Sequence, residues 1–302
     1  MRIAMNTNKK QKTTTTIIIL TTITILTTIF IYAQTRHKQT IQFDGEKAYK
    51  DVEYQVTLGP RTLGSAAHQE TRSWIRSELI TYGWEVENQE LSWENVPIQN
   101  IIGKRGNGSQ WVIIGAHYDS RFSADRDPNP SLRNQPVPGA NDGASGVAVL
   151  LELARCLPKN LNKTIWLVFF DAEDNGNLPG YDWLLGSRAF VGALTGIPNQ
   201  VVVIDMIGDK DLNIYKEKNS DVGITQSIWS TAASLGYQEF IPTLKYRIID
   251  DHMPFLEKKI PATDIIDFDY SYWHTTQDIL DKISAKSLQI VGETLRVWLL
   301  KE

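Results

Sequence analysis

The sequence predicts an α/β fold: a three-layer α/β/α sandwich with a mostly parallel central sheet, preceded by one N-terminal transmembrane helix. Two observations lead to this fold class. Short apolar runs alternate with segments of helical periodicity between residues 49 and 302, which is the order of elements in a parallel sheet covered by helices on both faces. Ahead of them, one uncharged segment is long enough to cross a membrane.

The N-terminal segment, Thr13 to Ala33, is uncharged and consists almost entirely of Ile, Leu and Thr. As a helix it can cross a hydrocarbon core of about 30 Å. Basic residues precede it, so the positive-inside rule keeps residues 1–12 in the cytoplasm and delivers the chain after residue 34 to the periplasm, the exterior or a lumen. We expect an uncleaved signal anchor. The alternative is a signal peptide cleaved after Ala33, which would release a secreted protein.

Residues 34–48 are expected to form a linker, and residues 49–302 one large domain. No repeat or low-complexity stretch divides that domain, and its length suits a single fold. A net charge of -4 provides no basic surface and argues against nucleic-acid binding. Cys156, the only cysteine, lies within an apolar helical pattern, so we expect the exported domain to depend on its core and not on disulfides.

The elements of this domain follow from two kinds of pattern. In the first predicted helix, 69–82, Trp74, Ile75, Leu79 and Ile80 share one side. Further helices are expected at 143–157, 183–194, 224–235 and 285–299. Nearly continuous apolar runs, typical of strands buried on both faces of a parallel sheet, predict strands at 111–116, 164–170, 201–207 and 261–267.

Polar residues stand at the carboxyl ends of three predicted strands: His117 and Asp119, then Glu173 and Asp174, then Asp205. Ligands bind at this edge of an open parallel sheet. A strand this apolar is not expected to end in three acids within four residues unless a cation or shared protons offset their repulsion. Imidazole and carboxylate are zinc ligands, so the pattern predicts a zinc enzyme. The alternative for each residue alone is structural: a helix cap, a hydrogen-bonded imidazole or a solvated acidic turn.

Five segments, taken together, resemble metallopeptidase family twenty-eight, the zinc aminopeptidases, whose fold also serves the animal-type glutaminyl cyclases. They read GAHYDS at 115–120, PGANDGASGVAVLLELAR at 138–155, FFDAED at 169–174, IDMIGD at 204–209 and WHTTQD at 273–278. The resemblance extends over about residues 50–300 and implies an α/β/α sandwich. It also implies a zinc ion held by Asp142, Asp174 and His274.

The same resemblance implies further roles. Glu173 would be the general base, and Asp119 would orient His117, in keeping with the rule that ligating imidazoles donate to a carboxylate. In the aminopeptidases of the family, a second zinc is held by the bridging Asp142 with His117 and Asp205. The two metals there activate water and hold the amine and the scissile carbonyl of the substrate.

Glutaminyl cyclases are similar to this framework but use one zinc. The metal polarises the side-chain amide of an N-terminal Gln, the substrate's own amine attacks it, and ammonia leaves. In that branch the carboxylate at the Asp205 position hydrogen-bonds an Asp from an Asp-Asp-His-x-Pro-Phe motif. This sequence has that motif at 250–255, whereas aminopeptidases of the family typically carry Ser at the position of Asp250. We therefore expect Asp205 and Asp250 to be catalytic residues joined by a hydrogen bond.

Aromatic residues support the cyclase interpretation. Trp273 directly precedes His274, and Leu-Gly-Ser-Arg follows Trp183 at 185–188, both as in the cyclases. We expect Trp183, Ile249 and Trp273 to line the substrate pocket, since an aromatic wall suits a small amide; the alternative for Trp273 is ordinary core packing. The Pro-rich stretch 123–130 is expected to be a mobile flap near the site.

The sequence therefore predicts a zinc-dependent, glutaminyl-peptide cyclotransferase-like enzyme with one zinc ion, acting on peptide N-termini. The alternative is a zinc aminopeptidase with two zinc ions. A third possibility, an inactive receptor-like ectodomain, is disfavoured because the implied ligand set and Glu173 are all present.

Overall fold

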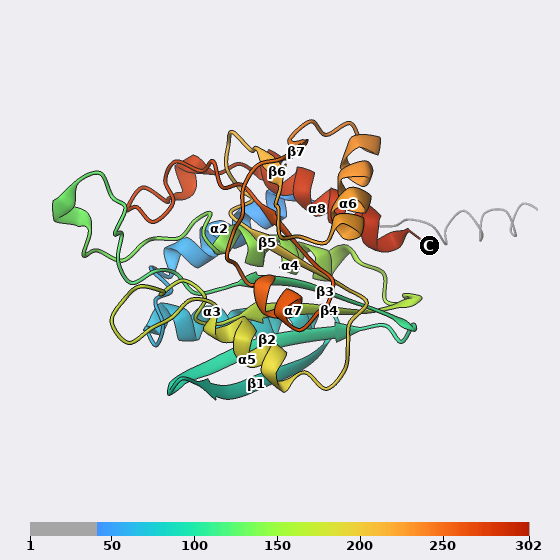
Figure 1. Ribbon diagram of the computed structural model, residues 1–302, viewed down its shortest axis with the longest axis horizontal. Coiled ribbons are helices and arrows are strands. Elements are labelled where there is room, and N and C mark those ends of the chain that lie inside the picture. Colours follow the sequence, from blue (N-terminus) through green and yellow to red (C-terminus); the bar gives the residue numbers. More distant parts are fainter. Residues whose placement is uncertain (1–40, 302) are drawn as a thin grey trace, which may run out of the picture. The chain divides into compact units, whose positions relative to one another are not determined.

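The computed structural model describes residues 41–301 of the chain, which are coloured from blue to red in Figure 1. The predicted cytoplasmic segment, 1–12, and the predicted anchor, 13–33, lie outside the described residues. Among residues 41–301, none of the helices has the length and apolar character needed to cross a bilayer. The first described helix, α2 (Gly45–Thr57), begins inside the segment predicted as a linker, and Asp44 caps it by accepting from two main-chain amides.

The central sheet has six strands in the order β1-β2-β4-β3-β5-β8. They are β1 (Glu85–Trp93), β2 (Val96–Arg105), β3 (Gln110–His117), β4 (Lys163–Phe170), β5 (Gln200–Asp205) and β8 (Ala262–Ile266). Strands β4, β3, β5 and β8 pair in parallel, while β1 and β2 add an antiparallel edge. The sheet is therefore mixed, and the four predicted strands form its parallel part.

The hairpin of β1 and β2 has no clear signal in the sequence. β1 lies at the sheet edge, and most of its residues are exposed or half-buried polar ones, so it lacks the apolar run by which the other strands are found. Its two-residue turn, Glu94 and Asn95, has positive φ angles of 50° and 66°. Such turns usually show Asn-Gly or Asp-Gly, and Glu in the first position hides the pattern.

The parallel strands are buried on both faces, as their apolar runs predict. In β4, Ile165 and Leu167 belong to the larger core cluster, whereas Val168 and Phe170 belong to a second cluster. Successive side chains of a strand point to opposite faces of the sheet. Each face therefore needs a layer of helices to exclude water.

The remaining elements are helices and one small sheet. The other helices are α3 (Ala66–Thr81), α4 (Ala144–Cys156), α5 (Leu185–Ala193), α6 (Val222–Ser234), α7 (Met253–Glu257) and α8 (Ala285–Leu300), with single 3-10 turns at Pro130–Leu132 and Leu280–Lys282. Strands β6 (Ile214–Lys216) and β7 (Phe240–Leu244) form a separate pair. The five predicted helices correspond to α3, α4, α5, α6 and α8, with ends displaced by up to three residues.

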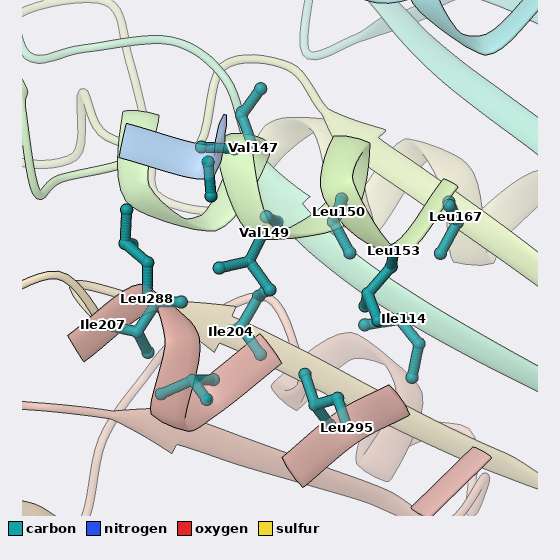
Figure 2. Close-up of a cluster of buried hydrophobic side chains, with 14 of the residues drawn as sticks. Ile114, Val147, Val149, Leu150, Leu153, Leu167, Ile204, Ile207, Leu288 and Leu295 are labelled. Carbon is teal, nitrogen blue, oxygen red and sulfur yellow. The ribbon is translucent and has the colours of Figure 1, made fainter. Parts of the chain in front are cut away.

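Helices cover both faces of the sheet. On one face α4 packs on β3, β4 and β5 and is covered in turn by α2 and α8. Figure 2 shows Val149 and Leu153 of α4 directed toward Ile204 and Ile114 of the strands and toward Leu295 of α8. On the other face α5 contacts β1, β2 and β4, and α7 contacts β8. The layers are those of the predicted sandwich.

Helix α8 also contacts the first described residues of the chain. The main-chain amide of Gly45 donates to Gln289 Oε1 at 2.7 Å, and that of Phe43 donates to Glu293 Oε2 at 3.3 Å. The ring of Phe43 packs against Gly292, where an added Cβ would lie 2.1 Å from the ring. Helices α2 and α8 are therefore joined along one side of the core.

Candidate metal centre and substrate pocket

The predicted site residues gather where the parallel strands end. His117 and Asp205 are the last residues of β3 and β5, and Glu173 lies just beyond β4. Asp142 immediately precedes the first turn of α4, and His274 lies in the loop that follows β8. Loops from four separate strands and one helix thus bring these side chains to one edge of the sheet, as expected for this topology.

Asp142, Asp174 and His274 form a buried cluster whose ligand atoms all lie within 4.8 Å of one another. His274 Nε2 is 3.0 Å from Asp174 Oδ1 and 3.8 Å from Asp142 Oδ2. Asp174 Oδ2 is buried and has no hydrogen-bond partner. One imidazole and two carboxylates, with a fourth position left for substrate, are a donor set that fits a catalytic zinc ion.

His117, Asp142 and Asp205 form a second cluster beside the first. His117 Nε2 lies 3.1 Å from Asp142 Oδ1 and 3.2 Å from Asp205 Oδ1. Asp142 therefore belongs to both clusters, with one oxygen facing each histidine. The structure assembles the residues of both implied metal positions.

Asp119 lies behind His117 and holds the acidic loop in place. Its Oδ1 is 3.4 Å from His117 Nδ1. The same carboxylate accepts from the main-chain amides of Glu173 at 3.0 Å and Asp174 at 3.2 Å, and from Asn175 Nδ2 at 3.3 Å. One fully buried carboxylate thus connects His117 to the loop that carries Glu173 and Asp174.

Asp125 lies behind His274 as Asp119 lies behind His117. The sequence did not identify Asp125 as a site residue. Asp125 Oδ1 lies 3.3 Å from His274 Nδ1. Arg121 fixes this carboxylate with two contacts, of 2.8 and 3.1 Å. A carboxylate behind a ligating imidazole sets its tautomer and orientation. No sequence signal pairs residues 125 and 274, because the contact depends on how a loop is placed.

The stretch 123–130, expected to be a mobile flap, is anchored to the loop that carries His274. The main-chain amide of Arg126 donates to the carbonyl oxygen of His274 at 3.2 Å. Asp127 Oδ2 accepts from the amide and the hydroxyl of Thr276, at 3.0 and 2.6 Å. The expectation of mobility rested on composition alone, whereas these hydrogen bonds fasten the stretch beside His274.

The loop that carries Asp142 is fixed from two sides. Asp278, which ends the last of the quoted motifs, accepts from the amides of Asn141 at 2.8 Å and Asp142 at 3.2 Å. Gly143 lies so close to His117 that an added Cβ would be 2.5 to 2.8 Å from its carbonyl oxygen and ring. A side chain at this position would displace the His117 ring.

The predicted hydrogen bond between Asp205 and Asp250 is not formed. Asp250 Oδ1 accepts from the amide of Asp251 at 2.5 Å, and its Oδ2 is buried. Asp250 instead clusters with His252 and with Asp264 of β8, their ligand atoms lying within 4.8 Å of one another. The prediction was wrong because the turn entering α7 places Asp250 against β8. Asp250 and Asp205 nevertheless line the same cavity.

Burial dominates the electrostatics of Glu173, Asp174 and Asp205. It raises the pKa of Glu173 well above its ordinary value, and the carboxylate of Asp174 adds to this. Burial also raises the pKa of Asp174 to about 6 and that of Asp205 to about 7, although His274 and His117 oppose these shifts. Such closely placed carboxylates repel one another unless a cation or shared protons offset their charge. A bound zinc ion would be such a cation.

A cavity of about 280 Å³ opens onto both clusters. All three predicted pocket residues, Trp183, Ile249 and Trp273, line it, together with Phe268. The Trp183 ring is nearly parallel to the His274 ring, with centroids 6.0 Å apart. The cavity therefore has a carboxylate and imidazole floor and largely apolar walls, three of whose residues are aromatic.

Known proteins resemble this chain in sequence and in structure. The model of peptidase family M28 matches residues 100–299. A glutaminyl-peptide cyclotransferase of Drosophila melanogaster is 26% identical over 278 residues, which cover 78% of this chain and 75% of the relative. A glutaminyl cyclase structure from Tannerella forsythia has 32% identity and a TM-score of 0.79, covering 86% of this chain and 99% of its own. A leucine aminopeptidase precursor from Bacteroides thetaiotaomicron has 30% identity and a TM-score of 0.82, covering 87% and 99%.

Proposed function

The chain belongs to peptidase family M28, and on that premise we propose that it is a zinc-dependent glutaminyl-peptide cyclotransferase. It converts the N-terminal Gln of a peptide into pyroglutamate and releases ammonia. Relatives named as cyclases and as aminopeptidases share its fold, so the choice depends on residues of the cavity. The observation that carries the proposal is Asp250, a carboxylate in the same cavity as Glu173 and Asp205 where family aminopeptidases typically have Ser.

The shape of the cavity supports a small amide substrate. Trp183 and Trp273 are large, flat walls that can hold the methylene groups of a Gln side chain, and each indole carries one hydrogen-bond donor. Gly176 allows Trp183 to lie where it does, because an added Cβ would be about 2 Å from the indole ring. The polar groups that would act on the amide are confined to the floor.

Asp142, Asp174 and His274 would hold the zinc ion, which when bound supplies Lewis-acid polarisation of the substrate amide. Glu173 accepts a proton from the attacking α-amine and returns it to the departing amide nitrogen. A bond forms between the α-nitrogen and Cδ, the bond from Cδ to the side-chain nitrogen breaks, and ammonia leaves without consumption of water. The raised pKa of Glu173, caused mainly by burial, suits a group that gains and then returns a proton.

One observation favours the aminopeptidase as a second candidate. His117, Asp142 and Asp205 are already assembled as a donor set, which is the second metal position of the aminopeptidases. With two metals and an activated water, the same cavity would hydrolyse the first peptide bond. We propose one zinc per chain because Asp250 matches the branch that uses one.

Product analysis separates the two activities. The zinc-loaded protein is incubated with Gln-Ala and Leu-Ala, and the products are identified by mass spectrometry. We expect pyroglutamyl-Ala and ammonia from the first peptide and no free leucine from the second. Release of free leucine, with maximal rate only at two zinc ions per chain, would establish the aminopeptidase instead.

Asp250→Ser is expected to abolish most cyclisation although it recreates the aminopeptidase motif. The change removes a buried carboxylate from the cavity floor and leaves the zinc ligands intact. Rates of ammonia release from Gln-Ala, with zinc content measured in parallel, check this. An unchanged rate in Asp250→Ser would show that Asp250 takes no part in the reaction.

We also propose that the catalytic domain is anchored to a membrane and faces away from the cytoplasm. The proposal rests on the uncharged segment 13–33 and the basic residues before it. Cell fractionation should find the full-length chain in the membrane pellet and release it with detergent but not with carbonate. A soluble form with an N-terminus near Gln34 would show that the segment is a cleaved signal peptide.

A further inference from the structure

We propose that Arg247, which lines the cavity, and Arg126, which stacks on the cavity residue Trp273, form a subsite for an acidic group on the peptide beyond its first residue. The inference rests on the proposed function, since it concerns the substrate of the same cavity. It names a preferred substrate class: peptides with Asp or Glu directly after the N-terminal residue.

Arg247 is an exposed residue that lines the cavity beside Ile249. Its Nη1 donates to Asn219 Oδ1. Asn219 is itself fixed, because its side-chain amide donates to the carbonyl oxygen of Ile248 at 2.9 Å and its main-chain amide donates to Glu217 Oε2 at 2.7 Å. The guanidinium is therefore held at the cavity wall with one side still available to solvent.

Arg126 is held against Trp273, a residue of the cavity wall. Its guanidinium carbon lies 4.3 Å from the centroid of the Trp273 ring, a cation–π contact. Its main chain is fixed by the hydrogen bond to the carbonyl oxygen of His274. Trp273 packs on Phe268 with centroids 5.0 Å apart, and Phe268 packs on Tyr246 at 5.4 Å. A row of three aromatic rings thus extends from Arg126 to Tyr246, the residue that precedes Arg247.

The two guanidiniums differ from the other cations nearby. Arg121 is paired with Asp125, and Lys245 is paired with Asp269. Among residues 41–301, no carboxylate lies within salt-bridge distance of Arg126 or Arg247; the guanidinium of Arg126 contacts Trp273, and that of Arg247 contacts Asn219. Each guanidinium is therefore free to pair with an acidic group of a bound peptide.

The peptide has to leave the cavity through its opening. When the N-terminal Gln occupies the floor near Glu173, the second residue lies at the mouth, where Arg247 forms part of the wall. A guanidinium presents a planar fork of donors that matches a carboxylate, whereas it repels a lysine side chain. An exposed pair of this kind changes affinity by about two- to fivefold. With two arginines, we expect a preference of about three- to tenfold for Asp over Asn.

The test compares three amidated peptides, Gln-Asp-Ala, Gln-Asn-Ala and Gln-Lys-Ala, on the full-length zinc-loaded protein in detergent at low salt. We expect kcat/KM to fall in that order, mainly through KM, and the differences to shrink in about 0.5 M salt because exposed charges are screened. Arg247→Gln and Arg126→Gln should each lower the Asp-to-Asn ratio about two- to fivefold. Arg247→Lys should restore part of it.

Lys50→Gln is the matched control, because it removes one exposed cation on α2, away from the cavity, and should leave the ratio unchanged. The same series is measured with Leu in place of Gln. If only the Leu peptides are turned over, the cyclase proposal fails, and their Asp-to-Asn ratio still decides the subsite. Equal rates for Asp, Asn and Lys, or a preference that survives both arginine-to-glutamine changes, would overturn the subsite.

Discussion

Glu173→Gln is expected to lower kcat by about a hundred- to ten-thousandfold, the usual contribution of a positioned general base. Gln has nearly the shape of Glu but cannot accept the proton of the attacking amine. The main-chain amide of residue 173 still donates to Asp119, so the loop and the neighbouring Asp174, an implied zinc ligand, remain in place. Zinc content measured by elemental analysis is expected to equal that of the unchanged protein, and the loss is expected in kcat with little change in KM.

Glu70→Gln provides the control for this variant, since Glu70 is an exposed acid on α3, remote from the cavity. It makes the same chemical change and should leave turnover as it was. A Glu173→Gln protein that kept near-normal turnover would remove Glu173 from the mechanism. A variant that lost its zinc as well would show that Glu173 acts as a ligand.

His274→Ala is expected to abolish tight zinc binding and, with it, activity. Two carboxylates alone leave the ion short of a closed shell of ligands. The substitution also removes the imidazole that lies between Asp174 and Asp125 at the floor of the cavity. Zinc titration followed by thermal unfolding measures the effect. Zinc at a hundred times its dissociation constant stabilises a folded protein by about 2.7 kcal/mol, and the variant should lose this stabilisation.

Asp125→Asn supplies a graded comparison for His274→Ala. It keeps the shape of the side chain but weakens the acceptor behind His274 Nδ1, so zinc affinity should fall by about ten- to a hundredfold and not vanish. Arg121 would lose its charged partner in the same variant. Full zinc content and full activity in His274→Ala would refute the assignment of the first cluster.

The parallel part of the sheet was predictable because burial on both faces requires a recognisable apolar run in the sequence. Strands such as β4 need apolar side chains at almost every position, and a run of this kind is visible in a single sequence. The edge hairpin has no such apolar run, since the residues of β1 are exposed to solvent or half-buried. Helix α2 was missed for a related reason: charged residues alternate with its buried ones. Elements that depend on tertiary partners are recovered least well from sequence.

Candidate site residues were predictable where they end a strand or belong to a motif. His117, Glu173 and Asp205 all come directly from the carboxyl ends of strands, and the structure brings them together. Asp125 and Arg121 could not be found, because a loop contact across the fold determines their place. The orientation of Asp250 was also beyond prediction, since a turn decides whether its carboxylate meets Asp205 or Asp264.

The attachment of α2 to α8 bears on how the protein is made. Helix α8, which covers α2 and α4, follows every other described element along the chain, so the apolar side chains around Leu288 and Leu295 reach the core only after those elements have been synthesised. A chain that terminates before residue 285 contains every implied zinc ligand, including His274. It leaves the apolar faces of α2 and α4 in water, and proteases remove such chains. A nonsense mutation in this region is therefore expected to yield no enzyme at all, in place of a shortened active one.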